Sequence, residues 1–390
     1  MLRRAGRFHR LKQTSSTPLD PEDTGETLHR KWLEWAERES LKRLVFHSFL
    51  LDAQISMTML TNPIISYAEL AIPFPESQDL WMAEDAEQWK TLYLGRPGPP
   101  PPPPQLQHPS LAHFLREPIE VPEYYDQHFA RQIILHGLWG MIWQHSQLCS
   151  AFGKVGHSQA ALALRYQDIL QAIRNFRVNL SAGHVSPCPE TSLVLELLPM
   201  YLHSSLEEIQ LFAGKEGLDD ARRVLPSLQR WVDGRDSRQA IWHAGQVLRA
   251  ARGFRPRQLR GSFTIAVYHA SLTIWTYSVI VQAKDAAQDG GQKSTNATRV
   301  VYLDGPDTPP IQQFITMGKA IPSIARIHGT GTSATTTVPL SDQNAVMSVF
   351  METLESNFPC YHEEQAPPPL VENLIQLLRD LGKAAGTIGG

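Results

Sequence analysis

Cysteine is scarce in this sequence. The 390 residues include three, Cys149, Cys188 and Cys360, and no two of them form a Cys-x-x-Cys pair. This wide spacing argues against a zinc ribbon and against the disulfide framework of a small secreted protein. The chain is therefore expected to fold around an apolar core, for which its 42% of hydrophobic residues suffice, and to work in a reducing compartment.

An excess of basic charge is also missing. The chain has 36 Lys and Arg against 39 Asp and Glu, which gives a formal net charge of -3. A protein that binds the phosphate backbone of nucleic acid through its body needs a positive field. The composition therefore predicts that the body of this chain does not bind DNA directly.

The motifs of common catalytic chemistries are absent, since the sequence has no Gly-x-Ser-x-Gly, His-Glu-x-x-His or phosphate-loop pattern. Residues 329–334, GTGTSA, match part of a dinucleotide fingerprint, but no clear strand precedes them and no helix opens directly after them. His128, His136 and His145 lie eight and nine residues apart, too far for one helical face to chelate a metal easily. We predict no catalytic residue, cofactor or metal in this chain.

Charged side chains are absent from one long run, Gly261 to Gln282, which is long enough to span a bilayer. The first residues, MLRRAGRFHRLKQTSST, are rich in Arg, Ser and Thr and lack acids, which is typical of a mitochondrial transit peptide. A buried helix that is apolar on nearly all sides and a basic, disordered tail over residues 1–27 give the same patterns. We favour these two interpretations, and a membrane-associated or mitochondrial helical protein is the first alternative.

The sequence does contain helical periodicity, which is clearest over residues 28–60. Apolar side chains recur there at spacings of three and four, so this stripe is predicted to be buried. Its members are Leu28, Trp32, Trp35, Ala36, Leu44, His47, Leu51, Ile55 and Met59. Glu39 and Arg43 form an acid-before-base pair that predicts a solvated face. The helix should end before Pro63, because a proline pushes the preceding residue out of helical geometry.

The same periodicity continues along the chain, apart from a proline-rich loop over residues 95–110 and a polar, glycine-containing loop over residues 284–299. The further helical segments are 124–152, 162–176, 193–212, 221–232, 238–252, 341–354 and 370–381. No strand alternation persists long enough to indicate a sheet. The predicted fold class is all-α, with one large, irregular multi-helix domain over residues 28–390 that carries the two loops on its surface.

The tryptophans form the most specific pattern, a Trp-x-x-Trp helix with a downstream acid and Arg-Leu, followed by a segment of proline and tryptophan. Three strings lie in the second half: RQAIWHAGQVLR (238–249), AVYHASLTIW (266–275) and VYLDGPDTPPIQQFITMGKAIPSI (301–324). This order, from about Leu28 to the C-terminus, resembles the fungal-specific transcription factor domain, or middle homology region. The residues that carry the resemblance are Trp32, Trp35, Glu39, Arg43, Asp52, Trp81, Trp89, Trp242, Arg249 and Trp275.

The resemblance implies a nuclear, all-helical regulatory domain that controls RNA polymerase II transcription, with these residues in its structural core. The string at 301–324 especially resembles members whose DNA-binding module is a pair of two-Cys two-His zinc fingers. This sequence contains no such finger. Zinc and DNA are therefore expected only through an N-terminal module that this chain lacks. The implied protein partners are transcriptional co-regulators or a second copy of the chain in a homodimer. A small-molecule effector is a further implied partner. Association with a membrane is not implied.

A helical enzyme that acts on an isoprenoid or lipid is the second alternative. Such an enzyme needs aspartate-rich motifs to hold its metal ions. The adjacent acids Asp219 and Asp220 do not supply these motifs by themselves. We therefore expect a regulatory and interaction domain rather than an enzyme.

Overall fold

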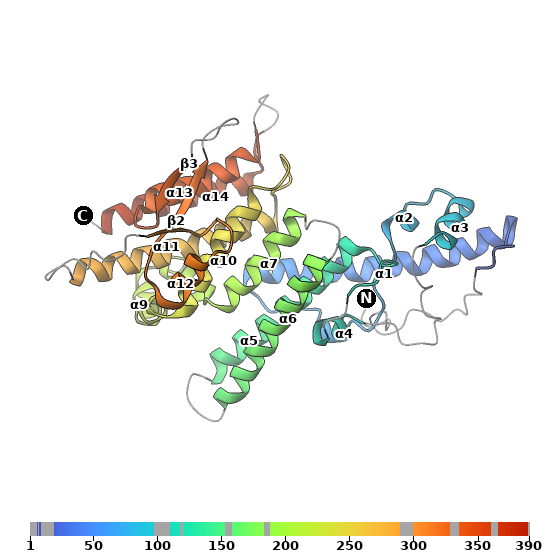
Figure 1. Ribbon diagram of the computed structural model, residues 1–390, viewed down its shortest axis with the longest axis horizontal. Coiled ribbons are helices and arrows are strands. Elements are labelled where there is room, and N and C mark those ends of the chain that lie inside the picture. Colours follow the sequence, from blue (N-terminus) through green and yellow to red (C-terminus); the bar gives the residue numbers. More distant parts are fainter. Residues whose placement is uncertain are drawn as a thin grey trace. The chain divides into compact units, whose positions relative to one another are not determined.

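The computed structural model of the chain describes residues 6, 8, 19–96, 110–117, 120–152, 158–182, 188–288, 299–327, 335–359 and 366–388 (Figure 1). They form two compact units, Met1–Ser186 and Pro187–Gly390. Most of the basic tail, of the proline-rich loop and of the polar loop lies outside the described residues, as does the string at 329–334. The single domain predicted over residues 28–390 stays a prediction.

Helices predominate in both units, which confirms the predicted fold class. In Met1–Ser186 they are α1 (Gly25–Met59), the 3-10 helix η1 (Tyr67–Glu69), α2 (Gln78–Trp81), α3 (Ala86–Leu94), α4 (Leu111–Arg116), α5 (Gln127–Phe152) and α6 (Ser158–Ala182). Helix α1 ends before Pro63 as predicted. Leu60 adopts a left-handed conformation with a φ of 52°, and its amide donates to the carbonyl of Ser56.

The long helix α1 organises the first unit, because both α3 and α5 pack on it, while α6 packs on α5 (Figure 1). An aromatic core joins α1 to its neighbours: the ring centroid of Phe46 lies 5.7 Å from that of Phe74 and 6.5 Å from that of Phe129. Trp139 of α5 donates its indole N–H to the hydroxyl of Ser56 at 2.9 Å. Burial of each such ring stabilises the unit by about 1.5–3 kcal/mol.

The buried face of α1 differs from the predicted one. Five side chains predicted to be buried are exposed: Leu44, Leu51, Ile55 and Met59 at 51 to 64%, and His47. Glu39, predicted on the solvated face, is fully buried, and Arg43 is only 9% exposed. Leu28, Trp35 and Lys42 are all buried and follow one another at intervals of seven residues, which is close to two helical turns. The face that begins with Leu28 therefore continues through charged residues, which the apolar pattern had excluded.

The second unit contains eight helices and three strands among the residues that the structure describes. The helices are α7 (Pro189–Leu202), α8 (Leu206–Phe212), α9 (Leu218–Asp233), α10 (Arg235–Ala251), α11 (Ser262–Gln288), α12 (Pro309–Met317), α13 (Gln343–Ser356) and α14 (Pro369–Ile388). Helix α11 is central, because α7, α8, α9, α10, α13 and α14 all contact it.

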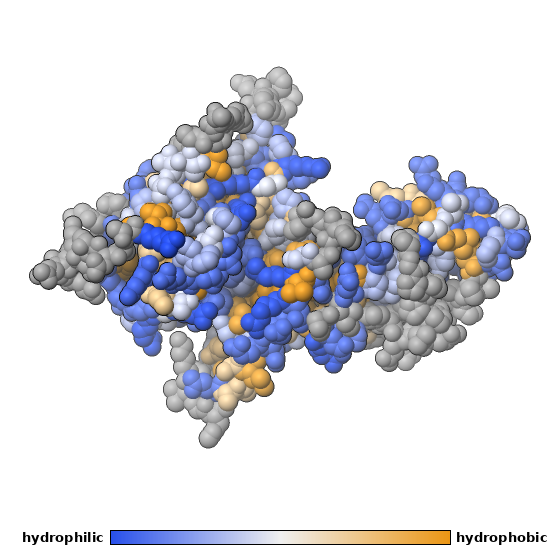
Figure 2. Space-filling view, viewed as in Figure 1, coloured by the Kyte–Doolittle hydropathy of each residue, from blue (hydrophilic) through white to orange (hydrophobic). Residues whose placement is uncertain are grey.

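This central position explains why the segment around α11 is almost free of charge. Ser262–Ala286 is long and apolar enough to cross a membrane, yet 83% of its most apolar window is buried inside the unit. Two of its buried hydroxyl groups bond to the backbone: Thr264 donates to the carbonyl of Leu259 and Thr273 to that of His269, both at 2.9 Å. The visible face of the unit is mainly hydrophilic (Figure 2). The apolar run thus has the burial that the core helix of a globular unit requires.

A small sheet is the element that the sequence did not predict. It has the order β1 (Val300–Tyr302), β2 (Ile321–Ile327) and β3 (Thr335–Pro339), with β1 parallel and β3 antiparallel to β2. The expectation that no sheet forms was wrong, because β1 is three residues long and shows too little alternation to detect. Helix α12 makes the crossover that the parallel β1–β2 pair needs.

The segment after β1 binds along one face of α10. The side chain of Gln246 donates to the carbonyls of Leu303 and Gly305 at 2.7 and 2.8 Å. Arg252 binds the carboxylate of Asp304, with 2.6 Å between Nη1 and Oδ2. Asp304 in turn accepts from the amide of Ala325 in β2. The strings at 238–249 and 301–324, which lie far apart in the sequence, therefore contact each other in the fold.

Gly245 allows this contact because a Cβ there would lie 2.4 Å from the carbonyl oxygen of Leu303. We expect Gly245→Ala to lower the free energy of unfolding by about 1–3 kcal/mol, because the backbone at Leu303 must move away. Ala250→Gly, at a half-buried position of the same helix, gives the size of a change in helix propensity, about 1 kcal/mol. Urea unfolding measures both. A Gly245→Ala variant as stable as the parent would contradict the close approach.

Candidate functional site

Six of the ten residues that carry the family resemblance meet in the first unit. Trp35 of α1 and Trp89 of α3 are 5% and 3% exposed, and their ring centroids lie 5.6 Å apart. They form a buried apolar cluster with Leu28, Leu80 and Ala86, against which the half-buried Trp32 and Trp81 pack. This tryptophan cluster holds α2 and α3 against the first half of α1. Asp85, the N-cap of α3, accepts from the amide of Gln88 at 2.8 Å and so starts α3 in place.

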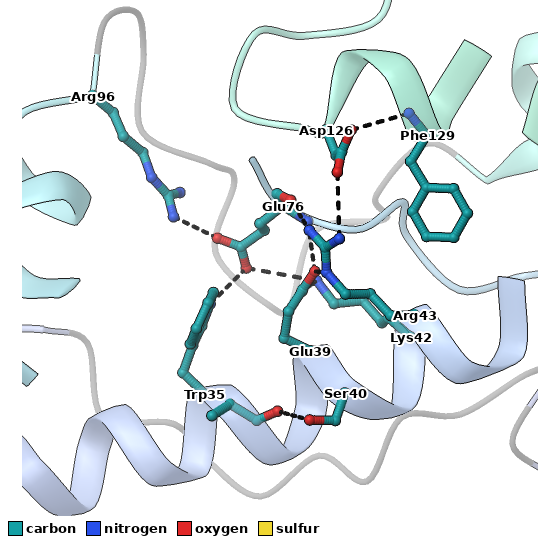
Figure 3. Close-up of polar contacts among 10 residues, drawn as sticks. Trp35, Glu39, Ser40, Lys42, Arg43, Glu76, Arg96, Asp126 and Phe129 are labelled. Carbon is teal, nitrogen blue, oxygen red and sulfur yellow. Dashed lines mark hydrogen bonds and ion pairs between the residues drawn. The ribbon is translucent and has the colours of Figure 1, made fainter. Parts of the chain in front are cut away.

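Next to the tryptophan cluster, charged side chains converge in a buried network (Figure 3). Glu39 lies at its centre with its side chain 1% exposed, and its Oε2 is 2.6 Å from Nζ of Lys42. Its Oε1 accepts from Nε of Arg43 at 3.1 Å and from the amide of Glu76 at 3.0 Å. One carboxylate therefore ties two turns of α1 to the segment that precedes α2.

Glu76 extends the network in the other direction. Its Oε1 accepts from the indole N–H of Trp35 at 3.2 Å, and its Oε2 accepts from Arg96 at 2.6 Å. Its backbone carbonyl accepts from Nη2 of Arg43 at 2.7 Å. Glu76 also pairs in an isolated antiparallel bridge with Tyr125, just before α5. Glu76 thus joins α1 to the chain just after α3 and to the chain just before α5.

Arg43 makes the third set of contacts. Its Nη1 lies 3.3 Å from Oδ2 of Asp126, whose Oδ1 accepts from the amide of Phe129 in the first turn of α5. The guanidinium also lies over the ring of Trp81, 5.1 Å from the centroid. A planar guanidinium is suited to this task, because it can donate in several directions and stack on an aromatic face. Arg43 therefore connects the tryptophan cluster to α5.

Charge in the network is balanced, with Glu39, Glu76 and Asp126 opposite Lys42, Arg43 and Arg96 (Figure 3). Burial raises the pKa of Glu39 above its ordinary value, although Lys42 opposes the shift. Burial would also raise the pKa of Glu76, but Lys42 and Arg96 together outweigh burial and hold that pKa below its ordinary value. Removing one partner of such a set leaves an uncompensated buried charge, which costs about 3–5 kcal/mol.

The network contains residues that the sequence did not single out. Lys42, Glu76, Arg96 and Asp126 belong to it together with the predicted Glu39 and Arg43. Only Lys42 had a signal in the sequence, because it lies seven residues after Trp35 on the same helical face. The other three come from segments whose positions depend on tertiary packing.

The remaining predicted residues lie elsewhere. Asp52 caps the turn after α1, where its Oδ2 accepts from the amide of Ile65 at 2.7 Å. In the second unit, Trp242 is buried in α10, and Trp275 of α11 is 4% exposed and donates to the carbonyl of Leu381 at 3.1 Å. Arg249 is exposed and donates to the carbonyl of Gly305 at 3.0 Å. The ten residues thus form one assembled site in the first unit and separate packing contacts elsewhere.

The chemistry of this site is that of a scaffold. Its carboxylates are engaged by cations and amides, and its indoles pack between helices. Within the described ranges, no group of three or more His, Cys, Asp or Glu residues is arranged to hold a metal ion. The class of protein that this fold and site define is a helical scaffold domain, in which charged and aromatic motif residues fix how the helices meet.

Comparison with known proteins gives the family. Residues 2–231 match the fungal specific transcription factor domain, which is more than half of the chain. The chain therefore belongs to the fungal-specific transcription factor domain family, and its helical scaffold is a regulatory domain of a fungal transcription factor. The resemblance inferred from the ordered tryptophans is confirmed. No solved structure matches the chain.

Curated relatives agree with this assignment. A transcription factor of Zymoseptoria tritici is 25% identical over 377 residues, which cover 84% of this chain and 37% of the relative. Transcription factor 1 of Elsinoe fawcettii is 26% identical, covering 84% of this chain and 36% of the relative. Zinc finger protein klf1 of Schizosaccharomyces pombe is 25% identical, covering 75% and 39%. The chain thus spans less than two fifths of the length of each of these relatives.

Proposed function

We propose that this chain is the part of a fungal transcription factor that contacts other regulatory proteins in the nucleus, and that it acts by binding rather than by catalysis. The observation that carries the proposal is the family match over residues 2–231. Two structural features support it. The motif residues of the first unit are used to hold helices together, and the only large balanced set of charges described there is internally paired.

We further propose that DNA and zinc are bound by a separate zinc-finger module of a longer protein. The support is that this chain spans 39% of a relative named as a zinc finger protein, and that its own net charge is -3. A duplex attracts proteins through a positive field, which this chain does not offer as a whole. Dimerisation and a small-molecule effector stay predictions from the family resemblance.

A reporter experiment tests the proposed function. The chain is fused to a heterologous DNA-binding module in a fungal host, and transcription is measured from a promoter that carries the operator of that module. We expect transcription to change several-fold relative to the unfused module. A promoter without the operator serves as the control and should not respond. The same fusion, tagged and imaged, should lie in the nucleus. A folded nuclear fusion that leaves transcription unchanged, or a mitochondrial signal of the tagged native chain, would contradict the proposal.

A further inference from the structure

The turn between α10 and α11 is rich in arginine, although the chain as a whole has no excess of basic residues. Residues 249–260, RAARGFRPRQLR, contain five arginines and no acid, whereas the whole chain carries a net charge of -3. Arg252 pairs with Asp304, and Arg249 and Arg260 donate to the carbonyls of Gly305 and Arg257. Arg255, Arg257 and Arg260 are here called the arginine turn.

The arginine turn presents its charge to solvent. Arg255 and Arg260 are exposed, and Arg257 is half-buried. Neither Arg255 nor Arg260 lies within ion-pair distance of a carboxylate in the part of the chain that the structure describes. Of the two acids of α13, Glu352 is engaged with Arg326, and Glu355 is exposed and forms no ion pair among the described residues. Because Nε of Arg260 donates to the carbonyl of Arg257, the groups available for an anionic ligand are the guanidinium of Arg255 and the two terminal nitrogens of Arg260.

The backbone of the arginine turn is held rigidly by Asn357, at the end of α13. The amide of Arg257 donates to the carbonyl of Asn357 at 2.6 Å, and the amide of Leu259 donates to its Oδ1 at 2.9 Å. The side chain of Asn357 also donates to the carbonyls of Phe254 and Arg255 at 3.3 and 3.0 Å. Leu259 is fully buried and anchors the turn in the core. A ligand would thus meet a preformed surface and avoid much of the cost of ordering it.

Arg257 has an unusual backbone conformation, with a φ of 65°. A non-glycine residue in this region costs of order 1 kcal/mol, and such residues are concentrated at functional sites. The contacts of Asn357 maintain the conformation here. The strained residue therefore lies at the centre of the arginine turn.

We propose that the arginine turn binds a short acidic peptide segment of a partner protein. Guanidinium groups bind carboxylates through paired, charge-assisted hydrogen bonds, which a lysine cannot reproduce. The small size of the basic surface favours a peptide over a duplex, because DNA requires phosphate contacts spread along a broad positive face. The half-buried Phe263, whose ring lies 5.3 Å from that of Phe254, adds an apolar edge beside the charges. This inference rests on the proposed function and names the chemistry of one partner.

Binding of a labelled peptide tests the inference. The probe is a fluorescein-labelled peptide of four Asp-Glu-Leu repeats, and its polarisation is measured with the full chain. We expect saturable binding, and we expect Arg255→Glu/Arg260→Glu to raise Kd at least about tenfold, because each charge-assisted contact is worth about that factor. The control variant Arg222→Glu/Arg223→Glu makes the same change of charge on α9, where the two side chains are 76% and 69% exposed. It should stay within about twofold of the parent.

Three results would overturn the inference: no binding, an equal loss of affinity in the control variant, or tighter binding of a DNA duplex than of the peptide. A peptide of Asn-Gln-Leu repeats, which has the same size and no charge, should not bind. The reporter experiment separates this inference from the proposed function. If the fusion alters transcription but the acidic peptide does not bind, only the peptide site is wrong. If the peptide binds but the fusion is silent, the proposed function is wrong.

Discussion

Replacing Glu39 with glutamine is expected to lower the free energy of unfolding of the first unit by about 3–5 kcal/mol. Glutamine has nearly the same size as glutamate, so the packing of α1 is kept and only the negative charge is removed. Lys42 and Arg43, both buried, then lose the carboxylate that lies 2.6 and 3.1 Å from their nitrogen atoms. The cost exceeds that of an exposed ion pair, which is at most about 1 kcal/mol, because water cannot replace the missing partner.

Urea unfolding of the full chain, followed by tryptophan fluorescence, measures this effect. Glu37→Gln is the matched control, because Glu37 lies exposed on the same helix and forms no ion pair among the described residues. It should change stability by less than about 0.5 kcal/mol. In a double-mutant cycle, Glu39→Gln/Lys42→Met should cost less than the sum of the two single changes. A Glu39→Gln variant as stable as the Glu37→Gln control would show that the network does not hold the unit together.

The position of this network explains where reading the sequence succeeded and where it failed. Helix α1 was predictable because its periodicity extends over many turns and Pro63 limits its end. Its buried face was not predictable, because Glu39, Lys42 and Arg43 occupy inward positions that an apolar pattern assigns to solvent. Their partners Glu76 and Asp126 come from other segments. No local rule relates such residues before the chain is folded.

The second unit also contains a contact that the sequence did not predict, and this contact involves the backbone. The strings 238–249 and 301–324 were recognised as motifs, yet their spacing in the sequence gave no sign that they contact each other. The contact depends on Gly245, which admits the chain at Leu303, and on Arg252, which reaches Asp304. Strand β1 is three residues long, so its pairing with β2 follows from this docking rather than from strand propensity. Ordered motifs therefore identified the family, while the sheet required the tertiary contact.

Acid is expected to destabilise the second unit through His269, which is buried in α11. Burial and the charge of Lys215 lower the pKa of His269 to about 3. In the unfolded chain the same imidazole titrates near 6.5, so the unfolded state binds more protons across the whole interval between these two values. The contribution of the neutral imidazole to stability is fully present above pH 6.5 and is lost as the pH falls towards 3. The expected slope is about 1.4 kcal/mol for each pH unit below 6.

Among the described residues, the groups that face His269 include no carboxylate. Its Nδ1 lies 2.7 Å from the hydroxyl of Tyr201, and its Nε2 lies 3.4 Å from the side-chain nitrogen of Gln210, which contacts Lys215. Burial raises the pKa of Tyr201, so this neighbour stays neutral as well. None of these groups stabilises an imidazolium. Protonation must therefore break the local packing or unfold the unit.

Urea unfolding at pH 7 and at pH 5 measures this dependence. The parent should lose about 2 kcal/mol through His269 between these two values. His269→Asn keeps a polar group that can bond to Tyr201 but removes the titration, so its loss over the same interval should be smaller by that amount. His136 of α5, whose pKa burial lowers to about 4, should give a similar effect in the first unit. His29→Asn, which makes the same substitution at an exposed histidine, is the control. If His269→Asn and the parent lose the same stability, His269 is not the group through which acid acts on α11.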